Sequence, residues 1–391
     1  MEGNAAECRS PRVKHAEVWL GAGFDTQAGE NHEYKEYGSD FHLLLTDQAN
    51  DIAEQPWHKN GLLFGTGRDA FRALLTYGMK ERGWRRFLVP SYFCQRVVAS
   101  FLTTGIDVVA YEDNPTLPAP RCENIELKSG DVVLAVNYFG LRPATDIKAI
   151  YGNDIEVIED HTHDPWSDWA YNSTADWCVV SLRKMLPAPD GGVLWSPAGH
   201  PMPYPTKLSD GHRQASLEKL AAMSLKGLYL NNQSINKEVF LRLARSGEAQ
   251  IASGEISGIS DWSGSMLNIF PTQLWRRQRR LNYQALYDVL ADVSWLTMFR
   301  AEENIGSCPF SGIVVFNTPG RRAYIQQKLI DSHIYTAVLW PLENPAVKGI
   351  DQAGLDLSRR MISVYCDMRY STKDMSYVGS RIKEIGASYR E

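Results

Sequence analysis

From residue 62 onward, short apolar runs of strand length alternate with stretches of helical periodicity, and this alternation constrains the fold more than any other feature. Strand-like runs occupy residues 87–90, 107–112, 132–139, 155–160, 177–181 and 192–195, and helices are expected near 68–82 and 93–104. Parallel strands need a crossover connection, which is usually a helix. The alternation therefore predicts a βα-repeating domain with a mostly parallel sheet.

Two of these strand-like runs end in polar residues. The run at 155–160 ends in Asp160, and the run that begins at Trp177 leads to Lys184, 24 positions after the aspartate. Strands that end in polar tips at one edge of an open sheet place those tips where α/β proteins bind ligands. A carboxylate for a pyridinium nitrogen and an amine for an aldehyde are the groups that pyridoxal phosphate (PLP) chemistry uses.

A glycine-containing turn precedes both strands. Gly65, Thr66, Gly67 and Arg68 place small residues at the start of the expected helix near 68–82. The backbone N–H groups and the dipole at a helix N-terminus favour a phosphate group. Such a turn also serves simply to begin a helix, so it gains weight from its position ahead of Asp160 and Lys184.

The remaining periodicity predicts a division of the chain into an arm, a large domain, a connecting helix and a small domain. Residues 1–55 read as an N-terminal arm, 56–265 as the large domain, 266–300 as an inter-domain helix and 301–391 as the small domain. The small domain shows a β-α-β-β-α order, with strands at 312–317, 335–341 and 361–366 and helices at 321–332 and 373–385. A long helix is expected over 271–293, with a proline in its first turn.

Charge and cysteine usage exclude several classes of protein. A net charge of −5 provides no general attraction to nucleic acid or to an anionic membrane. The arginine run at 276–280 spreads around a helix, so we expect a solvated or subunit-facing surface. Six scattered cysteines, no signal-peptide pattern and no apolar stretch of about 18 residues predict a cytoplasmic protein. His161 and His163 alternate on a strand, but other metal ligands are not evident, so we expect no metal.

Six segments, taken in order, resemble the fold type I PLP enzymes, and the DegT/StrS-type aminotransferases in particular. The resemblance covers residues 60–385 and implies a mostly parallel, seven-stranded type of sheet in a large domain, with a smaller α+β C-terminal domain. The segments are 65–70, 89–93 through Gly105, 136–140, 158–163, 181–184 with 190–192, and 361–370.

The resemblance also implies residue roles. Lys184 would bond to the PLP aldehyde and later shuttle a proton, while Asp160 would keep the pyridine nitrogen protonated. The phosphate would bind at Gly65, Thr66, Gly67 and Ser181. Tyr92 or Phe93 would stack on the ring, Asn137 or His163 would lie near its 3′-oxygen, and Arg369 is a candidate for holding a substrate carboxylate. Each aromatic residue could equally be a core residue, and Arg369 a surface arginine.

The expected function is transfer of an amino group from an amino acid such as glutamate to a small ketone or keto-sugar, in the biosynthesis of a sugar, polysaccharide or natural product. The resemblance implies a homodimer with shared active sites. The DegT/StrS-type enzymes usually carry an Asn-Tyr-Arg-Met segment whose asparagine reaches the cofactor phosphate of the partner subunit. The comparable segment here is Ser260–Met266, in which Ser263 or Ser265 is a candidate substitute for that asparagine. Decarboxylation, elimination or cyclisation on the same scaffold is the alternative, and a non-catalytic relative is a further one.

Overall fold

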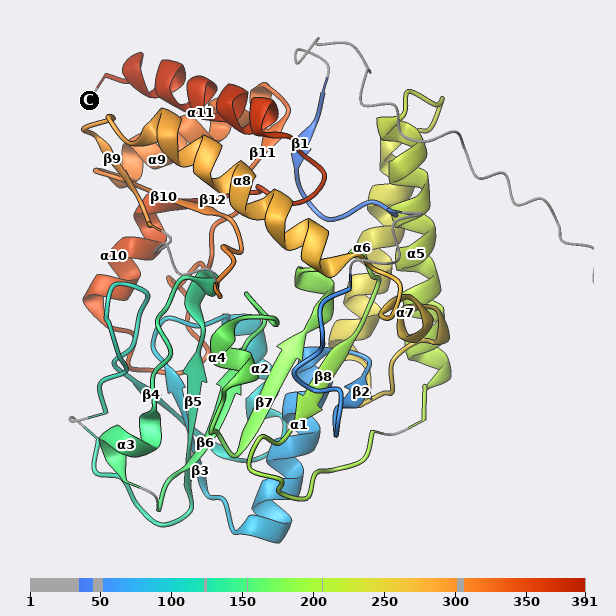
Figure 1. Cartoon of the computed structure of the whole chain (residues 1–391), viewed down its shortest axis with the longest axis vertical. Coiled ribbons are helices and arrows are strands. Elements are labelled where there is room, and N and C mark those ends of the chain that lie inside the picture. Colours follow the sequence, from blue (N-terminus) through green and yellow to red (C-terminus); the bar gives the residue numbers. More distant parts are fainter. Residues whose placement is uncertain are drawn as a thin grey trace, which may run out of the picture.

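The computed structural model describes residues 35–44, 52–122, 125–152, 154–205, 207–300 and 306–390. Most of the predicted N-terminal arm, at 1–34 and 45–51, lies outside these ranges. Figure 1 shows a large sheet with its helices in the lower part of the view, a smaller sheet with its helices above it, and α5 and α6 as an upright helical hairpin at one side. No helix within the described ranges has the length and apolar character needed to cross a membrane.

The large sheet has seven strands in the order β2-β8-β7-β6-β5-β3-β4. All run parallel except β8, which is antiparallel to both of its neighbours. This arrangement confirms the predicted α/β class and mostly parallel sheet. The strands are β2 Leu62–Phe64, β3 Arg86–Pro90, β4 Asp107–Tyr111, β5 Asp131–Val136, β6 Glu156–Asp160, β7 Trp177–Ser181 and β8 Gly192–Trp195.

The central strands form the larger hydrophobic core because their side chains are buried on both faces. Every residue of β5 is buried, as is normal for a parallel strand covered by helices on both sides. The helices in this part of the chain are α1 Gly67–Tyr77, α2 Gln95–Leu102, α3 Ile147–Tyr151, α4 Asp168–Tyr171, α5 Asp210–Leu230, α6 Lys237–Ser253, α7 Asp261–Met266 and α8 Thr272–Leu290. Short helical turns follow at Gly78–Arg82, Tyr138–Gly140 and Leu182–Lys184.

A second core forms around a three-stranded antiparallel sheet in the order β12-β10-β9. Its strands are β9 Leu296–Met298, β10 Gly312–Phe316 and β12 Met361–Val364, and its helices are α9 Pro319–Asp331, α10 Gln352–Arg360 and α11 Thr372–Ala387. Helix α8 contributes Tyr283, Leu286 and Leu290 to this core. The two cores support the predicted small α+β domain, while the exact domain boundaries stay predictions.

Two expectations for the C-terminal part were wrong. The predicted strand at 335–341 is reduced to β11 Ile334–Tyr335, which pairs with β1 Tyr37–Gly38, and an isolated bridge between Ala337 and Ser363 connects this segment to β12 of the small sheet. The arginine run was expected on a solvated or subunit-facing surface. Arg277 is exposed, but Arg276 and Arg279 are buried, where Arg276 pairs with Asp164 and Arg279 donates to the Phe310 carbonyl. These contacts connect α8 to the loops beside the large sheet.

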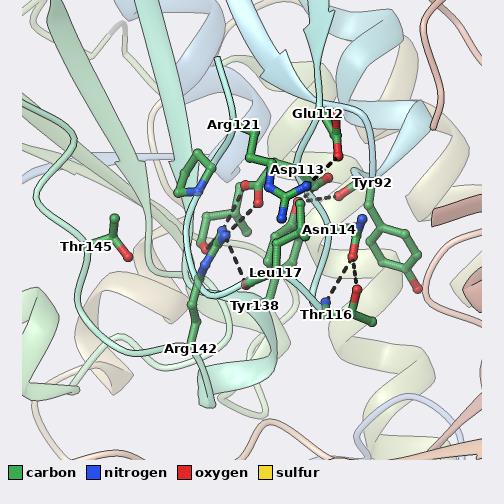
Figure 2. Close-up of polar contacts among 12 residues, drawn as sticks. Tyr92, Glu112, Asp113, Asn114, Thr116, Leu117, Arg121, Tyr138, Arg142 and Thr145 are labelled. Atoms are coloured by element: carbon green, nitrogen blue, oxygen red, sulfur yellow. Dashed lines mark hydrogen bonds and ion pairs between the residues drawn. The ribbon is translucent and has the colours of Figure 1, made fainter. Parts of the chain in front are cut away.

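The loops that follow β3 and β4 are held by a buried polar cluster (Figure 2). Arg142 and Asp113 form a bidentate ion pair with distances of 2.8 and 2.6 Å between nitrogen and oxygen. The Asp113 backbone carbonyl accepts from the Tyr92 N–H at 3.1 Å, and the Tyr138 hydroxyl donates to the Tyr92 carbonyl at 2.8 Å. The cluster therefore fixes the chain just before Phe93.

Candidate active site

The site lies at the carboxyl ends of β6 and β7, which are adjacent parallel strands with Asp160 opposite Val179. Asp160 and Lys184 line one cavity of about 170 Å³. The aspartate comes from the last residue of β6, and the lysine from the helical turn that follows β7. The structure thus brings together the two residues that the strand pattern singled out.

Lys184 lines this cavity and is accessible from it. Burial within the surrounding protein, followed by the neighbouring charge of Arg183, lowers the pKa of the Lys184 amine. A lowered pKa increases the fraction of neutral amine, which is the nucleophilic form.

Asp160 is buried, and its Oδ1 accepts the Thr162 N–H at 2.8 Å. Burial raises the pKa of this carboxyl, and the hydrogen bonds from Thr162 oppose the increase. A cation placed beside Asp160 would be stabilised by the ionised carboxylate because opposite charges attract strongly in a site of low dielectric constant.

The start of α1 forms another wall of the cavity through Thr66, Gly67 and Arg68. The Thr66 hydroxyl caps the helix: it accepts the Asp69 N–H at 3.1 Å and donates to the Asp69 carboxylate at 2.8 Å. Thr66 can therefore bind an anion through its backbone but not through its hydroxyl. The first N–H groups of a helix have no partner within the helix, so this end suits a phosphate group.

Ser181 and the glycine turn complete this end of the cavity. The Ser181 N–H donates to Thr162 Oγ1 at 2.9 Å, whereas its hydroxyl forms no hydrogen bond within the described ranges. Gly191 has a φ of +119°, and a Cβ on Gly192 would overlap the backbone of Thr66. Gly65 lies just behind this wall, where a Cβ would meet the His212 ring. The absence of side chains at these glycines therefore allows β8 to lie close to the N-terminus of α1.

His163 lines the cavity as a neutral imidazole. Its Nδ1 accepts the Phe139 N–H at 3.0 Å, and burial, followed by the charge of Lys184, lowers the pKa of His163 to about 3. A neutral imidazole that accepts at Nδ1 carries its proton on Nε2. His163 therefore has one N–H to donate to an oxygen of a bound ligand.

The structure separates the two residues within each predicted pair. Phe93 lines the cavity, whereas Tyr92 is fully buried and its hydroxyl donates to the Leu339 carbonyl. His163 lines the cavity, whereas Asn137 lies outside its lining and donates to Ser167 Oγ at 3.3 Å.

Arg369 does not line this cavity. Its guanidinium is paired with Asp367 at 2.8 Å and donates to backbone carbonyls of residues 38–40. It lines a separate cavity between α5 and β1, together with Lys226 and His42. Ser263 is also engaged elsewhere, because its buried hydroxyl donates to Asp190.

Several residues of the site gave no recognisable signal in the sequence. Phe310, Leu339 and Trp340 reach the cavity from the C-terminal third of the chain, and Arg183 and Glu248 line it beside α1. The Trp340 ring stacks on His163 with centroids 5.6 Å apart. An aromatic residue outside a periodic segment looks the same in sequence whether it fills a core or lines a site.

Glu159, His161 and Cys178 are the side chains nearest to a metal-binding arrangement within the described ranges. The Glu159 carboxylate already accepts from Trp169 Nε1 at 2.9 Å and from Ser173 Oγ at 2.6 Å, and it contacts His161 Nε2 at 2.9 Å. Hydrogen bonds thus account for the arrangement of Glu159 and His161.

Comparison with solved structures identifies the fold. Helicobacter pylori PseC, an aminotransferase involved in the biosynthesis of pseudoaminic acid, matches with a TM-score of 0.60 and 12% identity over 91% of this chain and 100% of that chain. The sugar aminotransferase CalS13 from Micromonospora echinospora gives 0.55 and 14% over 83% and 87%. NtdA from Bacillus subtilis, with bound cofactor PMP, gives 0.57 and 14% over 84% and 73%.

No family model and no curated protein matches the chain. The structural matches nevertheless extend over most of its length, and the large mixed sheet with the smaller C-terminal sheet agrees with them. The chain therefore has the fold of the PLP-dependent aminotransferases, and the predicted fold class is confirmed. At identities of this size the likeness establishes the fold alone.

Proposed function

We propose that this protein is a PLP-dependent aminotransferase that acts in the biosynthesis of a sugar or a sugar-containing product. The observation that carries the proposal is the opening of the Lys184 amine and the Asp160 carboxylate into one cavity, beside the N-terminus of α1. When bound, PLP supplies an electron sink for the electrons released at the substrate α-carbon.

Lys184 is the proposed covalent and proton-transfer residue. Its amine would hold the cofactor through the aldehyde carbon, and its Nζ, once the substrate amine had replaced it there, would move a proton away from the substrate α-carbon. The lowered pKa of Lys184 supports both roles, because each requires the neutral amine at some stage.

The remaining cavity residues would hold the ring. Asp160 would accept a hydrogen bond from the protonated pyridine nitrogen, and His163 Nε2 would donate to the 3′-oxygen. Phe93 lines the cavity close to both residues and is the proposed stacking partner. Thr66, Gly67 and Ser181 surround the end that suits the phosphate. Tyr92, Asn137 and Gly65 would support this lining from behind.

The proposed substrates follow from the matched structures and from the family resemblance. The titles of the matched structures describe sugar aminotransferases, so we propose a keto-sugar acceptor. Glutamate as donor is a proposal from the DegT/StrS resemblance, whose motif residues Gly67, Asp160 and Lys184 line the cavity. Arg369 is not included, because Asp367 and backbone carbonyls already occupy its guanidinium.

We also propose a cytoplasmic homodimer with active sites shared between subunits. The five cysteines that the structure describes are free thiols, which suits a reducing compartment. The dimer follows from the resemblance, and α8 and the segment 262–266 are the proposed contributors.

The test of function uses the cofactor's own absorbance. We expect the protein with PLP to absorb above 400 nm, borohydride to abolish this band, and the reduced cofactor to be recovered on the peptide that contains Lys184. Single amino acids, glutamate first, should then shift the band to near 330 nm and release the matching keto acid. A Lys184→Ala variant should show neither the cofactor bound covalently after borohydride treatment nor the shift of the band to near 330 nm.

Two outcomes would redirect the proposal. Failure of the protein to take up PLP would contradict it outright. Release of carbon dioxide, ammonia or an unsaturated product without a lasting shift would identify a decarboxylase, lyase or cyclase, which is the second candidate function on this fold.

A further inference from the structure

Four charged side chains crowd together beside the N-terminus of α1, and their charges do not balance. Glu248 on α6 accepts both guanidinium nitrogens of Arg183, at 2.9 and 3.0 Å, and the Lys219 amine at 2.7 Å. Arg68 Nη2 lies 3.6 Å from the same carboxylate. Three cations thus share one carboxylate, which leaves two positive charges uncompensated within the group.

The excess positive charge is largely shielded from bulk water, so the loss of hydration raises the free energy of these side chains. The side chains of Arg68, Lys219 and Arg183 are only 14%, 14% and 17% exposed. Burial, followed by the charge of Arg183, lowers the pKa of Lys219 to about 8 and also lowers the pKa of Arg68. Like charges that remain clustered in a partly buried place indicate that an anion belongs there.

Two guanidinium nitrogens in this group also lack hydrogen-bond partners among the described residues. Arg68 Nη2 and Arg183 Nε are buried and form no hydrogen bond with any residue that the structure describes. Buried polar atoms are nearly always hydrogen-bonded, so an unmade bond here requires a reason. Both arginines line the cavity that contains Lys184 and Asp160, and a ligand in that cavity would supply the acceptors.

We propose that Arg68 and Arg183 form a guanidinium clamp on the phosphate group of the cofactor, with Glu248 as the positioning residue that orients both arginines. This inference rests on the proposed function, since it assigns the phosphate end of that same cavity. A phosphate monoester carries about −1.5 to −2 charges at pH 7, which matches the two uncompensated charges. Guanidinium groups are suited to phosphate because their N–H donors match its oxygens in a fixed geometry.

The clamp has a consequence for the fold. Arg68 belongs to α1, Arg183 to the turn after β7, and Glu248 and Lys219 to the α5–α6 hairpin. The hairpin packs outside the large sheet (Figure 1) and otherwise contributes only this carboxylate to the cavity lining within the described residues. The hairpin therefore acts on the cofactor through its charges.

The test compares PLP with pyridoxal, which has the same aldehyde and ring but no phosphate. Cofactor-free protein would be titrated with each compound, and binding would be followed by the absorbance above 400 nm. We expect Arg68→Gln and Arg183→Gln each to raise the Kd for PLP by roughly 10- to 100-fold, or about 1.4 to 2.8 kcal/mol. The Kd for pyridoxal should stay unchanged.

Three further measurements separate the effect of charge from a general effect on the structure. Arg72→Gln is the matched control, because Arg72 lies one turn along α1, outside the cavity lining, and donates to the Gly254 carbonyl. It should leave both affinities as in the wild type. Arg68→Lys keeps the charge but loses the fork of donors, so its Kd for PLP should lie between those of the wild type and Arg68→Gln. Inorganic phosphate should compete with PLP for the wild type more strongly than for either arginine-to-glutamine variant.

The outcomes distinguish this proposal from the proposed function. Equal weakening of PLP and pyridoxal would overturn the clamp, because the arginines would then act on the whole site. An unchanged Kd for PLP with a raised KM for a phosphate-bearing substrate would also overturn it and would assign the arginines to that substrate. If the wild type bound neither PLP nor pyridoxal, the proposed function itself would fail.

Discussion

The buried Arg142–Asp113 pair gives the sharpest prediction about stability, because both side chains are almost completely withdrawn from water. Their exposed fractions are 3% and 0%. Burial raises the pKa of Asp113 even though Arg142 opposes the increase. The loss of hydration therefore offsets a large part of the attraction between the two charges. The structural importance of the pair therefore lies mainly in what happens when one partner is removed.

Asp113→Asn keeps the size of the side chain but leaves the Arg142 guanidinium without a counter-charge. The other hydrogen bonds of Arg142, to the carbonyls of Val136 and Leu117, are long at 3.4 Å, and neither they nor the Tyr138 ring, 5.1 Å from Cζ, carries a negative charge that could replace it. A buried charge stranded in this way costs about 3–5 kcal/mol. The variant should lose that much free energy of unfolding.

Urea denaturation followed by tryptophan fluorescence measures this loss as a change in the midpoint at constant slope. The neighbouring Arg121–Glu112 pair, also drawn in Figure 2, is the matched control. It has a distance of 3.3 Å and exposed fractions of 51% and 36%, so Glu112→Gln should cost less than about 1 kcal/mol. The double variant Asp113→Leu with Arg142→Met should be more stable than Asp113→Asn. A loss below about 1 kcal/mol in Asp113→Asn would refute the reasoning.

Three other predictions concern the site and the assembly. Asp160→Asn should keep PLP but lose turnover by roughly 10- to 100-fold or more, because an amide cannot replace a charge-assisted bond to the pyridinium; unchanged turnover would assign Asp160 another role. The folded protein keeps His163 neutral, because its pKa is about 3 against 6.5 for a free imidazole. As the pH falls from 6.5 towards 3, only the unfolded state gains a proton, and the free energy of unfolding decreases. Cofactor-free wild type should therefore lose roughly 2–3 kcal/mol more stability than His163→Phe between pH 7.5 and 4.5, and parallel curves for the two proteins would contradict this. Light scattering at micromolar concentration should give the mass of a dimer, and a stable, active monomer would be evidence against shared sites.

The sequence was most informative where the chemistry lies at the end of a strand. Asp160 and Lys184 follow apolar runs whose length and order specify parallel strands, so their meeting at one edge of the sheet could be predicted. The turn at residues 65–68 was recognisable for a similar reason, because the start of a helix is a local feature. These elements depend on neighbours in the chain and not on distant contacts.

Predictions based on a single local pattern were less successful where tertiary contacts decide the outcome. The arginine run at 276–280 has the composition of a solvated surface, yet Arg276 is buried because Asp164, 112 positions earlier, supplies its counter-charge. Helix α6 was not expected, and it provides Glu248 for the charged group at the phosphate end. A charged residue looks the same in sequence whether its partner is water or a distant carboxylate.

The sequence by itself determined the class of the fold, the succession of most strands along the chain and the two residues at the centre of the proposed chemistry. Only the tertiary structure decided which of Tyr92 and Phe93 lines the cavity, and that His163 does so while Asn137 and Arg369 do not. The same holds for Trp340, which stacks on His163 from a segment 177 positions later. The physical reason is that the positions of strands along the chain follow from local hydrophobic patterns, whereas the lining of a cavity depends on how separate segments pack and on which buried charges find partners.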